Sequence, residues 1–315
     1  QDLGSDFPKL RAHSLAAHPA SRQHIAGVVL NPHKMYTTSA ITLCSKGPCQ
    51  LPSNQVLLAY GLFLGVASAV FHFVARGEFS AILTLSGMFQ CLATVLLVLR
   101  SLTSGSAAGI SARSLAMEAL ALCCKLASTL FFDGYLPVDD SGDWIYQATD
   151  VLTLGLILFM LYLVLDAQKS SYDVAEDSLP VLPVIVSCFL GAATFHADLN
   201  ERPLFDSLWM AGLFLGVFAV LPQLWLISRT GGRPEALTSH FIALTALARV
   251  LSGTFMFHVR EDLTSRPVVQ GYNHAPWAIL GAHAVHLVLL ADFGYYYAKG
   301  IAKAGLACAL DLDIV

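Results

Sequence analysis

Two basic residues lie inside long apolar segments of the sequence. Lys125 falls in the segment 112–132 and Arg249 in the segment 238–258. A cation inside a membrane is costly, so it usually faces the interior of a helix bundle beside a partner. The two residues therefore predict either a site for an anion or a proton, or a buried ion pair that fixes how the helices pack. The candidate counter-charges are Glu118, Asp150, Asp206 and Asp292.

Histidines are the second group of residues that could act chemically, as ligands of a metal or a pigment. His72, His258, His283 and His286 lie in or near apolar segments, and the last two share one helical face. Imidazole can ligate the magnesium of chlorophyll in a pigment-bearing membrane, or haem or a metal in a respiratory one. The alternative is histidines bonded to lipid headgroups, water or backbone. Because the spacing is not specific, we predict no metal site, and no motif predicts an enzyme.

Pro222 and Gln223 interrupt the apolar segment 204–227. A proline inside a helix removes a backbone donor and crowds the preceding turn. The pair therefore predicts a helix kink, which either lets the helix flex or only fixes its shape.

The elements that must position these residues are membrane-spanning helices. The chain is 56% hydrophobic and 13% charged, with a mean hydropathy of +0.63, whereas soluble domains average roughly 25% charged residues. Eight apolar segments approach the roughly 20 residues needed to cross a bilayer core. Only helices satisfy their own backbone groups there, so we predict an all-α polytopic membrane protein. The segments are 55–75, 79–100, 112–132, 147–166, 179–195, 204–227, 238–258 and 275–298.

The loop charges predict the orientation. With eight spans both termini lie on one side, and that side carries most of the basic loop residues. The other side carries the acidic run Asp139, Asp140 and Asp143. The positive-inside rule then places both termini in the cytosol, matrix or stroma. The net charge of −4 gives no reason to expect a nucleic-acid partner.

Residues 1–54 form a polar extension that differs from the rest of the chain. They are rich in Ser, His, Ala and Pro and lack helical periodicity. Such a segment is ordered only where a neighbour holds it, so we expect other membrane-protein subunits to bind it. Its Cys44 and Cys49 either close a small disulfide loop or are free thiols.

An internal repeat organises most of the spans. Residues 97–121 and 224–248 align without a gap. Each segment closes one span, makes a short basic Gly turn and enters the next span through a hydroxyl residue. Ser111 and Thr238 are these residues and suit helix N-caps.

The repeat divides the chain into units. Spans 79–166 and 204–298 form two three-helix units, with 179–195 as the linking helix. This plan is typical of transporters built from parallel repeats, which bind ligands between the units. The span 55–75 is an addition, and 299–315 is a C-terminal tail.

Several motifs occur in order along the core: AGISARS (108–114), LPQLWLISRTGG (221–232), LTSHF (237–241), the buried Arg249 and ADFGYYY (291–297). On these motifs, residues 79–298 resemble the KDEL receptors, the ER lumen protein-retaining receptors, which share the architecture of PQ-loop and SWEET transporters. The resemblance implies a seven-helix core that binds the C-terminal retrieval tetrapeptide of escaped ER proteins. That activity needs cations, above all arginines, for the carboxylates of the ligand, and an aromatic wall.

Carried over residue by residue, the resemblance keeps part of the binding pocket. Arg249 matches the arginine of the sixth family helix, and Asp292 matches an acidic residue of the last helix. Lys125 replaces the arginine of the second helix, and Asp206 stands where a glutamate is expected.

Other pocket positions have changed. The arginine and histidine of the first family helix fall at Leu83 and Gln90, and the glutamate of the fifth falls at Gly216. Losing one buried partner of a bound carboxylate costs roughly 2–5 kcal/mol, so these changes predict the loss of tetrapeptide capture. The positions of two tyrosines and a tryptophan hold Ala248, Ser252 and Met256.

Three functions fit this sequence. The changed pocket, the added span and the start at Gln1 favour a structural subunit of a photosynthetic or respiratory complex, in a thylakoid or mitochondrial inner membrane. Bound lipid, and chlorophyll or another pigment, would suit that role. The second function is an ER–Golgi receptor with an altered signal preference. The third is a PQ-loop-type transporter of a small solute, which requires a water-accessible cavity between the repeats near Lys125 and Arg249.

Overall fold

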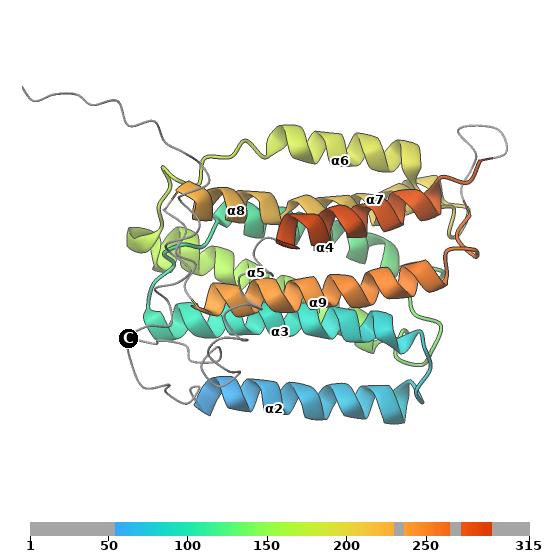
Figure 1. Cartoon of the computed structure of the whole chain (residues 1–315), viewed down its shortest axis with the longest axis horizontal. Coiled ribbons are helices and arrows are strands. Elements are labelled where there is room, and N and C mark those ends of the chain that lie inside the picture. The colour runs from blue at the N-terminus through green and yellow to red at the C-terminus, as the bar shows by residue number, and fades with distance from the viewer. Residues whose placement is uncertain (1–53, 230–235, 265–271, 292–315) are drawn as a thin grey trace, which may run out of the picture.

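The computed structural model describes residues 54–229, 236–264 and 272–291. Within these ranges the chain forms helices and loops without a strand, and the long helices run side by side (Figure 1). Most of the polar extension, Cys44, Cys49, Asp292 and the tail 299–315 lie outside the described residues. The helices are α2 (Asn54–Ala69), η1 (Val70–Val74), α3 (Ala81–Ser104), α4 (Ala112–Thr129), α5 (Ile145–Tyr162), η2 (Leu163–Ala167), η3 (Lys169–Ser171), α6 (Leu182–Phe195), α7 (Pro203–Phe218), α8 (Val220–Arg229), α9 (Ala236–His258) and a last helix, Ala275–Ala291.

Each of the eight predicted spans corresponds to one helix or to two consecutive helices. Leu182–Phe195 and Ala275–Ala291 are shorter apolar helices. The predicted fold class, an all-α polytopic membrane protein, is confirmed. Five helical stretches are long and apolar enough to cross a membrane: Asn54–Val74, Ala81–Ser104, Ile145–Ala167, Pro203–Arg229 and His240–His258.

The two three-helix units pack against each other in a reciprocal way. The first helix of each unit has its most extensive contact with the second helix of the other unit, α3 with α9 and α4 with α7. In the first unit, α5 packs on both α3 and α4. The linking helix α6 lies against α7 (Figure 1).

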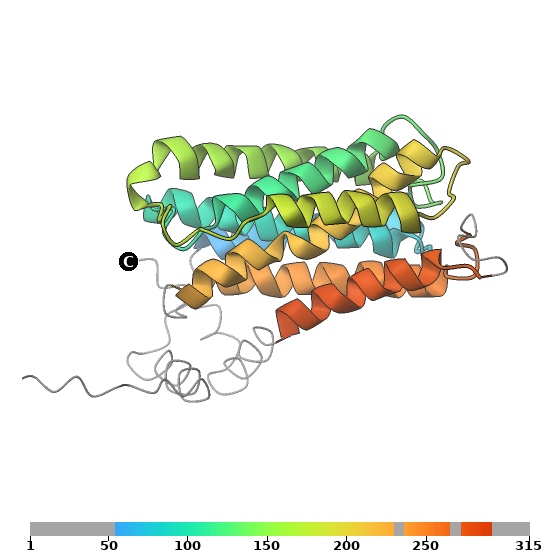
Figure 2. The same ribbon diagram turned by 90° about the horizontal axis from the view of Figure 1, so that it is seen from above.

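The last helix completes the second unit beside α9 (Figure 2). The two helices approach closely at Gly253, where an added Cβ would lie 3.4 Å from Cβ of His283. The small residue at position 253 therefore allows the last helix to bring its histidines toward the centre of the bundle.

The two predicted N-caps have different outcomes. Ser111 precedes α4, and its hydroxyl accepts a hydrogen bond from the Ser114 N–H at 3.1 Å. This bond satisfies one of the free donors of the first turn. The prediction for Thr238 was wrong, because α9 begins at Ala236 and Thr238 lies inside it.

The helix that carries Pro222 is interrupted at Ala219, and this break separates α7 from α8. The proline ring crowds the preceding turn and opens it. The Ala219 carbonyl oxygen at the break accepts a hydrogen bond from the Ser114 hydroxyl at 2.5 Å. The irregular turn is therefore held against the start of α4.

The additional helix α2 lies at the edge of the bundle against α3 (Figure 1). Val56 and Leu96 belong to the apolar cluster between these helices. The Tyr60 hydroxyl is hydrogen-bonded to Nδ1 of His240 on α9 at 3.0 Å, so α2 contacts both units. Leu62 and much of the remaining α2 surface are exposed and apolar, as expected for a helix that faces lipid.

Candidate functional site

A cavity of about 90 Å³ lies between the two three-helix units. Its walls come from α3, α4 and α5 of the first unit and from α7, α9 and the last helix of the second. This volume is enough for several water molecules. Its lining residues are Leu83, Ser86, Gly87, Gln90, Glu118, Ala121, Leu122, Lys125, Tyr146, Asp150, Trp209, Gly212, Leu213, Gly216, Ala248, Arg249, Ser252, Met256 and His283.

Lys125 is ion-paired within this cavity. Its Nζ lies 2.7 Å from Oδ2 of Asp150 on α5, and it also lies 4.2 Å from the centre of the Tyr146 ring. Asp150 is therefore the counter-charge of Lys125 among the four candidates that the sequence offered. The pair joins α4 to α5 inside the first unit and neutralises the lysine.

Arg249 lines the same cavity but, unlike Lys125, has no ion-pair partner among the described residues. Its guanidinium packs against the bare backbone of Gly216, where an added Cβ would lie 2.9 Å from Nη2. Among the described residues no carboxylate lies within 4.0 Å of it, and its Nε is buried without a hydrogen-bond partner. Arg249 is therefore a cation whose bonding capacity is open to the cavity.

Glu118 is the second charged residue of the cavity lining that has no bonded partner among the described residues. It lies on α4 and lines both the main cavity and a smaller neighbouring cavity of about 30 Å³. It attracts Arg249 and Lys125 electrostatically, but it forms neither an ion pair within 4.0 Å nor a hydrogen bond there. The site thus holds one paired and one unpaired set of opposite charges.

The positions that differ from the receptor pattern converge on this cavity. The motifs placed these positions on three different helices, and the fold brings all three helices to the lining of one cavity. All six line the cavity: Leu83, Gln90, Gly216, Ala248, Ser252 and Met256.

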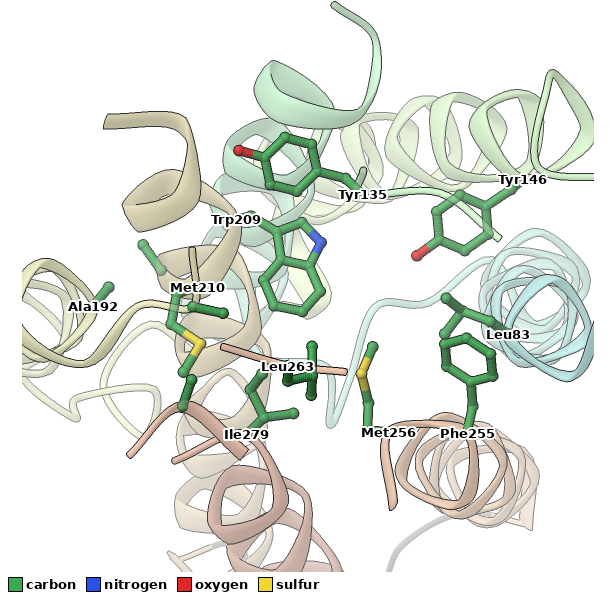
Figure 3. Close-up of a cluster of buried hydrophobic side chains, with 13 residues drawn as sticks. Leu83, Tyr135, Tyr146, Ala192, Trp209, Met210, Phe255, Met256, Leu263 and Ile279 are labelled. Atoms are coloured by element: carbon green, nitrogen blue, oxygen red, sulfur yellow. The ribbon is translucent and has the colours of Figure 1, made fainter. Parts of the chain in front are cut away.

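An aromatic wall is present, but it comes from other helices than the resemblance implied. Trp209 on α7 and Tyr146 on α5 line the cavity. Figure 3 shows both rings turned toward a common space that Leu83 and Met256 also border. Sequence reasoning missed these two residues because it compared single positions with a family pattern, and neither position belonged to that pattern.

Asp206 lies outside the cavity lining. It is buried, and its Oδ1 accepts hydrogen bonds from the Tyr135 hydroxyl at 2.6 Å and from the Leu199 N–H at 3.3 Å. Burial raises the pKa of the Tyr135 hydroxyl well above its usual value, and the bond to Asp206 raises it further. The structure therefore makes Asp206 an anchor for two loops and does not bring it together with Lys125 and Arg249.

The four predicted histidines separate into two pairs. His72 and His258 are exposed, and the His258 ring packs on Phe79 with the ring centres 4.3 Å apart. His283 and His286 are buried, and their ring nitrogens have no hydrogen-bond partner in the described residues. No three His, Cys, Asp or Glu residues of the described chain gather as a metal site would require. Pigment ligation by the histidines stays a prediction.

Gln223 of the Pro–Gln pair has a bridging role. Its amide nitrogen donates to the Gly109 carbonyl at 2.7 Å, and its amide oxygen accepts from the Ser111 N–H at 2.9 Å. Gly109 has φ +77°, which favours glycine at this turn. The Ser111 hydroxyl in turn donates to the buried Asp177 at 2.8 Å. Gln223 therefore fixes α8 to the turn that begins α4.

The fold and the cavity define a polytopic helical membrane protein with a charged cavity between two related three-helix units. The family model described as ER lumen protein retaining receptor matches residues 106–258. An ER lumen protein-retaining receptor of Drosophila melanogaster is 26% identical over 67% of this chain and 90% of its own length. For receptor 3 of Xenopus laevis the values are 27%, 70% and 92%, and for receptor 2 of Homo sapiens 28%, 67% and 90%. The chain is therefore similar to the ER lumen protein-retaining receptors at low identity, which is the resemblance that its motifs indicated.

Proposed function

We propose that this protein is a membrane receptor of the ER–Golgi system that binds the C-terminal carboxylate of a peptide in its central cavity. The observation that carries the proposal is Arg249, a cavity-lining guanidinium without a carboxylate within 4.0 Å among the described residues. A planar guanidinium can hold a carboxylate through two parallel hydrogen bonds. The relatives, which are named for retaining ER lumen proteins, support the same function.

The sequence alone favoured a structural subunit of a photosynthetic or respiratory complex that has lost signal binding. The loss of several pocket residues was the main argument for that role. The cavity contains both cations, and Trp209 and Tyr146 supply an aromatic wall. These features support a changed binding preference more directly than a lost site, so we place the receptor first and keep the subunit role as an untested alternative.

A small-solute transporter is the second candidate, because a specific observation favours it. The cavity between the units lies near Lys125 and Arg249, where the transporter interpretation requires it. Uptake of a solute by vesicles that contain the purified protein would support this function over the receptor.

Binding of free-carboxylate tetrapeptides to purified protein tests the receptor function. Fluorescent peptides from a library with varied sequence are titrated against the wild type and Arg249→Gln in mild detergent. Removing the arginine is expected to weaken binding by roughly 2–5 kcal/mol, at least about 30-fold. Arg249→Lys should give an intermediate loss of affinity, because lysine keeps the positive charge but cannot form the two parallel hydrogen bonds of the guanidinium.

The control variant is Arg76→Gln, which removes an exposed arginine whose side chain is 79% accessible. It should bind as the wild type does. Equal binding by Arg249→Gln and the wild type would contradict the proposed site, provided that both variants have the same thermal stability in detergent.

A further inference from the structure

From the charges of the cavity, we infer that the ligand carries one carboxylate and, close to it, one positively charged group. The site would therefore take a peptide end with a basic residue next to its terminal carboxylate rather than an acidic one. This inference rests on the proposed function and adds the charge pattern of the ligand.

The first step is that, among the described residues, one cation of the cavity is available to a ligand. Lys125 is held by Asp150 at 2.7 Å and covered by the Tyr146 ring. A ligand carboxylate could use it only by displacing Asp150, which would leave that carboxylate buried without its partner. Arg249 has no such competitor among the described residues. One carboxylate of the ligand is therefore accommodated, and a second is not.

The second step is that the cavity also presents an acidic side chain without a bonded partner in the described residues. Glu118 lines the cavity and has no ion pair or hydrogen bond in the described part of the chain. A charge inside a membrane protein is costly unless a partner compensates it. A cationic group of the ligand would supply this partner, whereas a second ligand carboxylate would be repelled.

The third step is that the two residues without a bonded partner, Arg249 and Glu118, lie in the same part of the cavity. Glu118, Gln90 and Gly216 line both the main cavity and the smaller one, so they lie where the two cavities meet. Arg249 packs on Gly216 at this same place. The two unpaired charges are thus close together, which suits a ligand whose opposite charges are on neighbouring groups.

Among the described residues, the remaining wall offers no other cation to an acidic ligand. Its other members are uncharged, apart from His283, whose ring nitrogens have no partner among the described residues. His283 is buried and lines the cavity together with Arg249. The charge pattern of the site is therefore set by Arg249 and Glu118.

The test compares three fluorescein-labelled peptides, Ala-Ala-X-Leu with a free carboxylate and with Lys, Gln or Glu at X. Fluorescence polarisation with the purified full chain is expected to give the order Lys, Gln, Glu, with at least tenfold tighter binding for Lys than for Glu. In Glu118→Gln the preference for Lys should disappear, while the Gln peptide binds at least as tightly as before. Glu261→Gln, at an exposed acid, should leave the order unchanged.

Two results would overturn the inference in distinguishable ways. If the Glu peptide binds as tightly as the Lys peptide or more tightly, the charge pattern is wrong although the receptor function stands. If none of the three peptides binds the wild type, the inference and the receptor function fail together. A melting curve for Glu118→Gln in the same detergent separates lost preference from lost folding.

Discussion

At the scale of single residues, the cavity contains two pairs of opposite charges in different states. Lys125 and Asp150 are ion-paired at 2.7 Å, whereas Arg249 and Glu118 have no bonded partner in the described residues. A buried pair is sensitive to the loss of one member, because the other charge is then left without compensation. This difference separates a structural pair from a pair that is available to a ligand.

The structural role of the first pair can be tested by substitution. Lys125→Gln alone should destabilise the protein by up to about 3–5 kcal/mol, because Asp150 stays buried and unpaired. The double variant Lys125→Gln with Asp150→Asn should recover most of this loss. Thermal unfolding in mild detergent measures both. As a control, Arg76→Gln breaks an exposed pair with Asp140 and should change stability by no more than about 1 kcal/mol. A double variant as unstable as the single one would contradict this account.

Sequence reasoning reached part of this site. It identified Lys125 and Arg249 because cations are conspicuous in apolar segments, and the motifs located the cavity positions. It could not choose Asp150 among four acids, because that choice depends on how the helices are rotated against one another. For the same reason it placed Asp206 with the pocket, while the fold uses that residue to hold Tyr135 and Leu199.

At the scale of helices, the close contact between α4 and α7 depends on Gly212. A Cβ at this position would lie 2.8 Å from the Ala121 carbonyl oxygen. Backbone atoms cannot move aside as the end of a flexible side chain can. The contact positions Lys125 on α4 opposite Trp209 and Gly216 on α7.

Gly212→Ala is therefore expected to push α4 and α7 apart. Overpacking of this kind costs typically about 1–3 kcal/mol, and peptide binding should weaken as well. The matched control is Gly61→Ala on α2, where an added Cβ meets nothing within 4 Å. That change should be neutral or slightly stabilising, since alanine is the better helix former. Similar melting temperatures for the two variants would show that the helix contact is less tight than described.

The Gln223 bridge offers a second test at this scale. Gln223→Leu would leave the Ser111 N–H and the Gly109 carbonyl without their partners. Unsatisfied buried groups cost roughly 1–3 kcal/mol each. Gln223→Glu keeps the acceptor for the Ser111 N–H and should lose less stability. Unfolding measurements in which Leu and Glu have the same effect would contradict a bridge made of two bonds.

The helices themselves were predictable because long apolar segments have few alternatives in a bilayer. Their ends were less predictable, as the position of Thr238 inside α9 shows. The break at Ala219 could be expected near Pro222, but its stabilisation by the Ser114 hydroxyl could not. That bond joins segments that are far apart in the sequence.

At the scale of the whole molecule, the loop charges predict the orientation in the membrane. The loop with Asp139 and Asp140 is expected in the lumen, and the loop with Lys169 and Glu176 in the cytosol. The sequence contains no Asn-X-Ser/Thr glycosylation site. Introduced sites can therefore report the side of each loop.

An acceptor site with a short spacer is inserted after Val138 in one variant and after Val174 in another. Both residues are exposed, at 96% and 62%. We expect endoglycosidase-sensitive glycosylation of the first variant only, which would support both the orientation and the ER–Golgi membrane. Glycosylation of the second variant only would reverse the orientation, and a lack of glycosylation in both would favour an organellar membrane.

The most direct test of the central claim compares one peptide in two forms. The tightest peptide of the library is titrated as the free acid and as the C-terminal amide against the same wild-type preparation. If Arg249 holds the terminal carboxylate, the amide should bind at least about 30-fold more weakly, and in Arg249→Gln this difference should vanish. Equal affinity of the acid and the amide for the wild type would contradict carboxylate recognition in the central cavity.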